Sequence, residues 1–598
     1  MSLQHANRPG FPSLCLRPPA FLSRHSLYAG LLTLFALVSR LAGLGHRAMS
    51  HDESLHALYA WYLSSAFHYE HDPMMHGPLL FHLNALVYLL FGANDFSARL
   101  VPALLGTACV AVTAWLYPRW LGRRGARIAA ALVALSPGLL FYSRYLRNDI
   151  YICLFTLLLV WSALRYRESA DAKYLIGLSV SLALSFACKE VAFIHGTVLG
   201  VSALVFTGIG FHKTRRFHCA DKRWADLAVT LLTLALPFAA ALPLSLLGID
   251  PTASRDPAVQ RATLIAAAAL SCVSWLLAVF WFKTRSLFNI WVRAFLLFWS
   301  IQVLLYSTLL SNPAQGLTSG IAAGLGYWLA QHGVQRGASD PMFYLSLLLL
   351  YTPLLLVTFG LSLKDRRKPS VALFLMWAIG NAVIYSVAGE RMPWLLIHIT
   401  LPLCLLAGPV LADAFAQPTR LRFLLIPLLM HLVINSLRAV GPLAESPNEP
   451  LFYAHAGPQI KTALRILESG TKREPDAVIH VDPDYTWPLA WYLRGQPVIY
   501  SPLPVPEAGL RITSPALQTA YREQGWISRG EFDLIHWPRQ HWHALTPGNV
   551  HSLITQPRVR RNFVRFYLLR TLPPLTPDDF PQPVRFVILS HQNGKDSD

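Results

Sequence analysis

The chain has 598 residues, of which 54% are hydrophobic and only 14% are charged, yet its formal net charge is +19. A soluble chain carries about 25% charged residues, so a string of soluble domains is excluded, and the apolar content excludes a disordered chain. The positive charge could form a patch that binds nucleic acid, or it could mark one side of a membrane. The position of the charges along the chain decides between these explanations.

Long apolar segments predict helices that cross a bilayer, because lipid cannot satisfy backbone polar groups and about 20 apolar residues are needed to span it. The sequence contains thirteen such segments, at residues 26–45, 95–117, 127–143, 148–165, 173–188, 190–210, 226–247, 262–282, 288–310, 341–363, 370–387, 393–415 and 421–440. We therefore expect a mainly α, polytopic membrane protein with about 13 transmembrane helices.

The basic residues follow this pattern of segments. If the N-terminus lies inside, the inner loops carry 23 Lys and Arg and the outer loops carry 8, which is the bias typical of inner loops. The tail after residue 440 is then outside and nearly neutral, with 16 Lys and Arg against 15 Asp and Glu. The excess charge belongs to the membrane part, which argues against nucleic acid as a partner. We expect a multi-pass protein of the cell inner (plasma) membrane.

Three parts follow from this topology: a cytoplasmic segment 1–25, a transmembrane domain 26–440 with a first outer loop 46–95, and an extracytoplasmic domain 441–598. In the tail, short apolar runs predict strands and amphipathic runs predict helices, so we expect a small α/β domain. The strands are predicted at Ala477–Val481, Pro497–Tyr500, Phe532–His536 and Arg585–Leu589, and the helices at Ile460–Glu468 and Trp487–Arg494. All seven cysteines lie outside this tail, so a disulfide framework is not expected there.

The first outer loop is rich in groups that could carry chemistry. It contains five acids and seven of the 22 histidines. Its apolar stretches Leu55–Tyr69 and Gly77–Phe91 predict two helices that lie along the membrane surface. A loop held in this way could present fixed carboxylates at the membrane face.

Two interpretations of Asp52 and Glu53 stay open at this stage. They begin a helix pattern, and acids in the first turn of a helix stabilise its N-terminus. Alternatively, one of them is a general base that accepts a proton from an incoming hydroxyl, since acids next to hydrocarbon are costly and tend to be functional.

The histidines could bind a divalent metal together with these acids. However, His51 and His56 are five residues apart, as are His71 and His76, whereas two ligands on one helix face need a spacing of four. We therefore expect no metal, although a divalent metal remains possible. His76, directly before Gly77-Pro78, is predicted to orient a substrate or a carboxylate.

Three further polar clusters lie at the outer boundary, at residues 143–149, 189–190 and 389–394. These ions could snorkel and pair with one another, or they could form a site for an anionic headgroup through charge-assisted hydrogen bonds. The predicted phosphate-binding set is Arg144, Arg147, Lys189, Glu190 and Arg391. Nucleotide-binding glycine loops are absent from the sequence, so a nucleotide-driven pump is not supported.

Four short motifs follow one another along the chain: Asp52-Glu53, His76-Gly77-Pro78-Leu79, Ala98-Arg99-Leu100-Val101-Pro102 and Arg147-Asn148-Asp149. In these motifs the chain resembles the GT-C glycosyltransferases, among which the protein O-mannosyltransferases and the bacterial lipid A aminoarabinose transferases are the nearest branch. The resemblance covers roughly residues 25–500. A narrower resemblance is to the prokaryotic flippase-activity-associated membrane proteins, through Ala388–Trp394 with His398, Tyr327-Trp328 with Gln331-His332, and Trp487-Pro488 with Trp491–Arg494.

The resemblance implies transfer of a sugar, outside the cytoplasm, from a polyprenyl-phosphate-linked donor to a protein, lipid or glycan acceptor at the membrane surface. It implies catalytic roles for Asp52, Glu53 and Asp149. The basic residues would bind the leaving phosphate, and His76, Glu390 and Trp394 would orient the substrate. We expect an inverting displacement, since one carboxylate facing a basic cluster suits a reaction without a covalent intermediate.

Two other functions remain as alternatives. The same basic cluster could receive a lipid headgroup in a flippase or transporter, although such proteins usually show internal repeats and the sequence shows none. The chain could also be a non-catalytic subunit of a glycan assembly machine.

Overall fold

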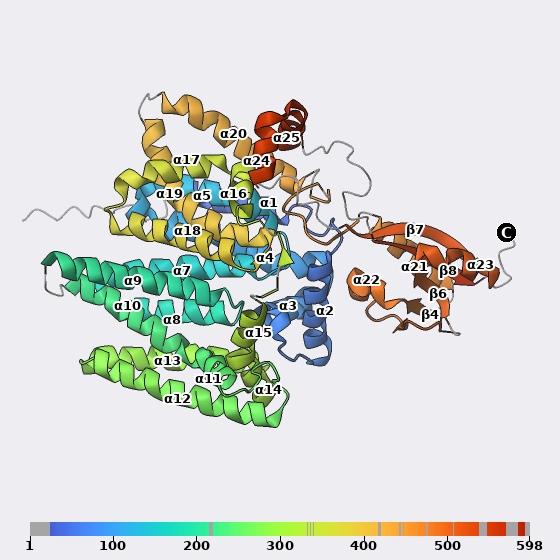
Figure 1. Cartoon of the computed structure of the whole chain (residues 1–598), viewed down its shortest axis with the longest axis horizontal. Helices are drawn as coiled ribbons and strands as arrows, with labels where there is room; N and C mark the ends of the chain where they lie inside the picture. Colours follow the sequence, from blue (N-terminus) through green and yellow to red (C-terminus); the bar gives the residue numbers. More distant parts are fainter. Residues whose placement is uncertain are drawn as a thin grey trace, which may run out of the picture.

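The structure is a computed structural model that describes residues 24–214, 219–331, 333–334, 336–338, 340–416, 420–441, 444–446, 448–457, 459–473, 477–505, 508–536, 547–569 and 584–591. Nearly all of the predicted segment 1–25 lies outside the described residues. A bundle of long, roughly parallel helices carries a small sheet domain at one end (Figure 1). That end of the bundle is called the domain face below.

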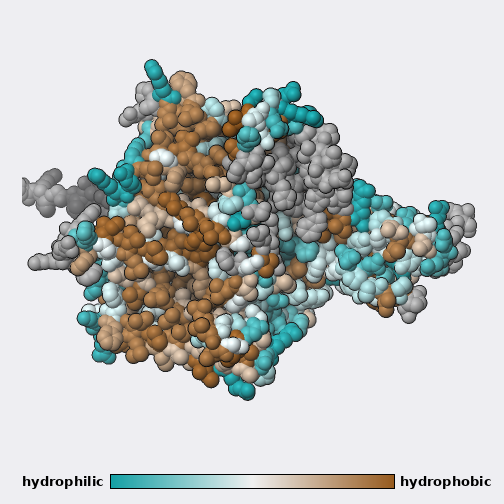
Figure 2. Space-filling model, viewed as in Figure 1, coloured by the Kyte–Doolittle hydropathy of each residue, from teal (hydrophilic) through white to brown (hydrophobic). Residues whose placement is uncertain are grey.

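The bundle is a membrane-spanning unit. Within the described residues, nine helices are long and apolar enough to cross a bilayer, and the bent pair α16 and α17 raises this to ten if it forms one span. Figure 2 shows a continuous apolar surface over these helices and a hydrophilic surface over the sheet domain. The spanning helices are α4 (Asp95–Leu116), α7 (Asp149–Ser169), α9 (Ala192–Thr214), α10 with η3 and α11 (Cys219–Leu246), α12 (Pro257–Trp281), α13 (Arg285–Tyr306), α16 (Phe343–Tyr351) with α17 (Pro353–Ser362), α18 (Pro369–Val387), α19 (Leu396–Ala416) with the short η6 (Pro393–Leu395), and α20 (Leu421–Val440).

The predicted number of thirteen spans is not confirmed, although every predicted segment is helical. Three of them fall short of a regular span. Helix α1 (Arg24–Leu41) has 18 residues with an arginine at or near each end, and α8 (Ala172–Phe186) has 15. The third segment is divided between α5 (Pro118–Leu135) and α6 (Pro137–Tyr142). The predicted and observed numbers of spans therefore differ because these helices are short or interrupted, whereas about 20 residues are needed to cross the hydrocarbon core.

The first loop forms the two predicted surface helices, α2 (His51–Ala66) and α3 (Leu79–Phe91), joined through η2 (Pro73–Met75). The loop is fixed to the connection between α8 and α9. The backbone N–H of Gly77 donates to Cys188 at 3.0 Å, and that of Leu79 donates to Ala187 at 2.9 Å. A Cβ at Gly77 would lie 2.3 Å from the Ala187 carbonyl oxygen, so this approach requires glycine.

The sheet domain has six strands in the order β3-β7-β8-β6-β4-β5. Strand β4 pairs in parallel with β5 and β6, and the other pairs are antiparallel. The four predicted strands and the two predicted helices are present as β4 (Val478–Val481), β5 (Val498–Tyr500), β7 (Trp526–His536), β8 (Val584–His591), α21 (Ile460–Arg473) and α22 (Thr486–Tyr492). The sequence did not predict β3 (His455–Ala456) or β6 (Ala508–Thr513). The expected α/β character is confirmed.

The sheet domain docks on the first loop through α22. The carboxylate of Asp95 accepts hydrogen bonds from Trp491 Nε1 and from the Tyr492 hydroxyl, both at 3.0 Å. The ammonium of Lys461 donates to the Gly45 carbonyl at 2.9 Å. These contacts place the domain directly over the loop that carries Asp52.

Candidate functional site

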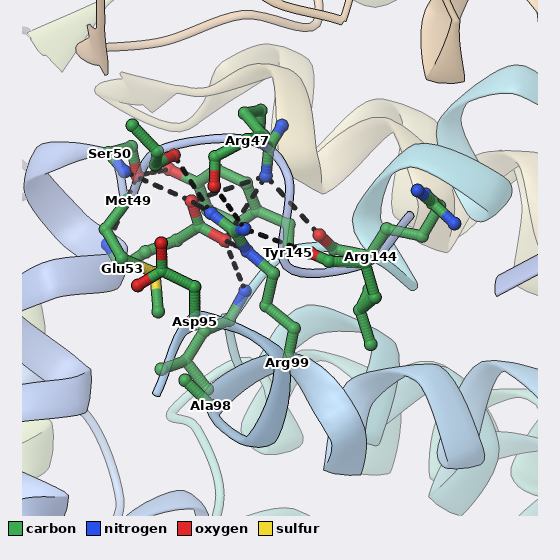
Figure 3. Close-up of polar contacts among 12 residues, drawn as sticks. Arg47, Met49, Ser50, Glu53, Asp95, Ala98, Arg99, Arg144 and Tyr145 are labelled. Atoms are coloured by element: carbon green, nitrogen blue, oxygen red, sulfur yellow. Dashed lines mark hydrogen bonds and ion pairs between the residues drawn. The ribbon is translucent and has the colours of Figure 1, made fainter. Parts of the chain in front are cut away.

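The Glu53 carboxylate is part of a saturated cluster, which we define as Glu53 with Arg47 and Arg99 (Figure 3). Glu53 occupies the third position of α2 and forms a capping box with Ser50. Its oxygens accept from Arg99 at 2.7 and 2.8 Å and from Arg47 at 3.2 and 3.3 Å. The capping interpretation of the sequence thus applies to Glu53.

Backbone groups complete this cluster. The N–H groups of Ser50 and Leu146 both donate to Glu53 at 3.1 Å, and the side chains of Glu53 and Arg99 are 0% exposed. Burial alone would raise the pKa of Glu53, but Arg99 and Arg47 hold that pKa well below its usual value. A carboxylate with two arginines and two N–H groups around it has little capacity left to take a proton from a substrate.

The Asp52 carboxylate belongs to a second cluster, which we call the open cluster: Asp52, Arg147, Asp149 and Lys189. Asp52 Oδ2 lies 2.5 Å from Arg147 Nη1, and Oδ1 lies 3.1 Å from His51 Nδ1. The Asp52 side chain is 21% exposed. Although Asp52 precedes Glu53 directly, consecutive helix residues point about 100° apart, so the two carboxylates meet different partners.

Arg147 connects Asp52 to Asp149, which begins α7. Arg147 Nε lies 3.4 Å from Asp149 Oδ2, and the Lys189 ammonium contacts both Asp149 oxygens at 2.8 and 3.1 Å. On its other side Asp149 meets His398 Nε2 of α19 at 3.1 Å. The Asp149 carboxylate is nearly fully buried, so its charge depends on these partners and on the N-terminus of α7.

The indole ring of Trp394 lies against the two cations of the open cluster. The Arg147 guanidinium is 3.5 Å from the ring centroid and the Lys189 ammonium is 6.0 Å away. Such contacts stabilise cations that have lost water. Trp394 is 2% exposed, and its Nε1 has no hydrogen-bond partner among the described residues.

A small cavity opens beside Lys189. His76 Nδ1 lies 2.8 Å from Glu190 Oε2 at its edge. Burial opposes ionisation of Glu190, but His76 keeps the pKa of that carboxyl below its usual value. The polar residues that line the cavity are His76, Lys189, Glu190, Gln331 and Glu390. The apolar side of the lining includes Val191, Ile194, Trp328, Tyr385 and Leu395.

Two predicted phosphate-binding residues, Arg144 and Arg391, do not line this cavity. Arg144 donates to the carbonyls of Ser39 and Arg40, both at 2.9 Å, and it lines a separate cavity with Arg47. Arg391 donates to the carbonyls of Ser386 at 2.9 Å and Ala338 at 3.3 Å. Of the four predicted basic residues, Arg147 and Lys189 meet on one carboxylate, that of Asp149.

The electrostatics of Asp52 and His56 fix their charges near neutral pH. Burial would raise the pKa of Asp52, but the Arg147 guanidinium and His51 hold it well below its usual value. Burial and the charge of Arg147 lower the pKa of His56 to about 4. Asp52 is therefore ionised and His56 neutral across the physiological range.

His398, which contacts Asp149, was not among the predicted site residues. A signal was available, because His398 follows Trp394 by four residues and these positions share one face of a helix. No group of three or more His, Cys, Asp or Glu side chains in the described part of the chain is arranged to hold a metal ion.

Comparisons with known proteins agree with this architecture. Residues 75–240 match the family of dolichyl-phosphate-mannose-protein mannosyltransferases. The apo oligosaccharyltransferase of Archaeoglobus fulgidus has a TM-score of 0.50 at 13% identity and covers 96% of this chain and 89% of its own. ArnT from Cupriavidus metallidurans bound to undecaprenyl phosphate has a TM-score of 0.50 at 13% identity, over 85% of this chain and 96% of its own.

The chain therefore shares the fold of these two membrane proteins, and a part of it, residues 75–240, matches the mannosyltransferase family. No curated protein sequence matches the chain. The predicted GT-C fold is thus confirmed, while the activity and the narrower flippase-activity-associated subfamily stay predictions. In this fold, the Asp52-Glu53 motif separates into one fully paired carboxylate, Glu53, and one that belongs to the open cluster, Asp52.

Proposed function

We propose that this chain is a GT-C glycosyltransferase that moves a sugar from a polyprenyl-phosphate-linked donor to an acceptor at the domain face, with inversion at the anomeric carbon. The observation that carries the proposal is the continuous series Asp52, Arg147, Asp149 and Lys189 beside a cavity with polar and apolar walls. ArnT from Cupriavidus metallidurans, which has the same fold, was solved with undecaprenyl phosphate.

The domain face is the extracytoplasmic side in this proposal. The loops at the opposite end of the bundle carry most of the Lys and Arg of the membrane part, which is typical of cytoplasmic loops. The sheet domain and the open cluster then lie outside the cytoplasm, at the surface of the cell inner (plasma) membrane. A donor that is anchored in the bilayer would reach Lys189 from the membrane.

Lys189 and Arg147 are the groups that bind the donor phosphate. Without a donor, their two charges are balanced by Asp52 and Asp149. When the bond between the anomeric carbon and the phosphate oxygen breaks, its electron pair stays on that oxygen, and the added charge is stabilised by cations already in place. Asp149 and His398 act through Lys189 as positioning residues.

Asp52 is the base that receives the acceptor proton. The acceptor oxygen attacks the anomeric carbon from the face opposite the phosphate, and its proton passes to Asp52. A donor phosphate that takes over Arg147 would weaken the ion pair at Asp52 and so raise the basicity of that carboxylate. Glu53 supports this geometry as part of the fold, and His76, Glu190 and Glu390 orient the sugar.

The test is sugar transfer from a polyprenyl-phosphate sugar in vesicles that contain Asp52→Asn protein. We expect the transfer rate to fall about 10²- to 10⁴-fold. Asp365→Asn, at a partly exposed acid that pairs with Lys368 and lies outside the open cluster, is the matched control and should retain full transfer. Undiminished transfer by Asp52→Asn would exclude Asp52 as the base, and headgroup inversion without any transfer by the native protein would favour a flippase instead.

A further inference from the structure

Helices α24 (Pro547–Thr555) and α25 (Pro557–Leu569) depart from the sheet domain, although they lie between β7 and β8 in the sequence. They lie beside α20 and α16 at the domain face (Figure 1). Residues 547–569 contain no acid and four arginines: Arg558, Arg560, Arg561 and Arg565. A tail that is nearly neutral as a whole thus concentrates positive charge in one segment, which we call the α24–α25 segment.

Aromatic contacts hold this segment against the membrane-spanning bundle. The hydroxyl of Tyr567 donates to the Leu349 carbonyl of α16 at 2.6 Å, and its ring stacks on His431 of α20 with centroids 5.1 Å apart. Phe566 is 1% exposed. On α20 itself, Met430 and Leu437 are exposed, so the segment is continuous with the surface that faces lipid.

The solvent-facing side of the segment combines apolar and basic groups. Ile554 is 70% exposed, and Val564 and Leu568 are about half exposed. Arg561, Arg565 and Leu568 recur at intervals of three and four residues, so they share one helix face. Arg560 donates to the Ile554 carbonyl at 3.5 Å. Among the described residues, no acidic side chain pairs with Arg558, Arg561 or Arg565.

We propose that the α24–α25 segment is a binding site for anionic phospholipid headgroups at the membrane interface. A helix with apolar residues and arginines lies in the interface plane, with its apolar side chains in the acyl region and its cations at the phosphates. Lysines and arginines near an anionic membrane surface are each attracted to it. The positive-inside bias does not account for four arginines at the domain face.

The segment is separate from the proposed donor site. None of its residues lines the cavity beside Lys189, and its arginines have no contact with the open cluster. Its role is therefore to fix the docked sheet domain to the bilayer, over the first loop.

The experiment measures lipid retained by the purified full-length protein, by native mass spectrometry, after incubation with phosphatidylglycerol or phosphatidylcholine. The test variant is Arg561→Gln/Arg565→Gln. The matched control, Arg465→Gln/Arg522→Gln, removes two exposed arginines from the sheet domain. We expect phosphatidylglycerol to bind the test variant about 5- to 30-fold more weakly than the native chain, with the control unchanged and Arg561→Lys/Arg565→Lys restoring binding.

Equal retention of phosphatidylglycerol by the test and control variants would overturn the proposal. So would equal binding of the two phospholipids by the native chain, or binding of polyprenyl phosphate alone. Because no sugar transfer is measured, failure here leaves the proposed reaction unaffected, and failure of that reaction leaves this binding site unaffected.

Discussion

The saturated cluster and the open cluster begin at adjacent residues of one helix, yet they differ in what they can do. Glu53 is fully buried and accepts from two arginines and two backbone N–H groups. The Asp52 side chain is 21% exposed and contacts one arginine, Arg147, and one histidine, His51. The difference shows that a carboxylate's role is set by how many donors the fold gives it, rather than by its residue type or its place in a motif.

The largest effect is expected from replacing Arg99, the fully buried arginine of the saturated cluster. Arg99→Met leaves Glu53 charged and partly unpaired in a buried site, which typically costs about 3–5 kcal/mol of stability. We expect a lower free energy of unfolding, measured by thermal and denaturant unfolding in detergent.

The double variant Glu53→Leu/Arg99→Met removes both charges together and should recover part of this loss. An Arg99→Met protein as stable as the native chain would mean that the saturated cluster does not hold the fold.

Replacing Lys189 tests whether the open cluster binds the leaving phosphate. Replacement by Met removes one of the two cations for the leaving phosphate, and loss of one such stabilising group costs about 10²- to 10³-fold in rate. The measurement is the rate of sugar transfer in vesicles. Lys472→Met, at an exposed lysine paired with Glu468, is the control and should transfer at the native rate. An undiminished rate for Lys189→Met would remove this lysine from the phosphate site.

Gly77 tests whether the first loop must dock closely. An alanine Cβ would meet the Ala187 carbonyl at 2.3 Å, and overpacking of this kind costs about 1–3 kcal/mol. We expect Gly77→Ala to lower the melting temperature and to slow transfer, because His76 moves with Gly77. Gly30→Ala, where nothing lies within 4 Å of the added carbon, should change neither. A Gly77→Ala protein with native stability would show that the docking contact is loose.

The pH dependence of transfer should be small. The pKa of Asp52 lies well below its usual value because of Arg147, so this carboxylate is ionised above about pH 4 and its ion pair is lost only as the pH falls through the lowered pKa. The pKa of His56, about 4, keeps that histidine neutral over the same range. We expect a transfer rate that is flat from about pH 5 to 8. A decline with a midpoint above pH 5 would contradict the assignment.

The elements that depend on local pattern could be predicted from the sequence. Apolar length gave the bundle helices, and the short apolar runs gave β4, β5, β7 and β8. The alternation of charge between loops predicts which end of the bundle faces the cytoplasm, and that orientation stays a prediction. The predicted number of spans is not confirmed, because composition does not reveal breaks such as the one between α5 and α6.

The pairings between distant residues could not be predicted. Glu53 meets Arg99 of α4, 46 residues away, and no local pattern links them. Arg144 and Arg147 looked equivalent in sequence, but they lie in an irregular turn, where Arg144 bonds the Ser39 carbonyl and Arg147 pairs with Asp52. The return of the α24–α25 segment to the bundle also depends on tertiary contacts of Tyr567.

The most direct test of the central claim compares Asp52→Asn and Glu53→Gln in two measurements on the same protein preparation. The transfer rate is measured in vesicles, and the melting temperature is measured in detergent. We predict that Asp52→Asn lowers the transfer rate by about 10²- to 10⁴-fold and leaves the melting temperature nearly native. For Glu53→Gln we predict that the main effect is a lower melting temperature. If Glu53→Gln abolishes transfer at native stability, or if Asp52→Asn transfers at the native rate, the assignment of the two carboxylates is contradicted.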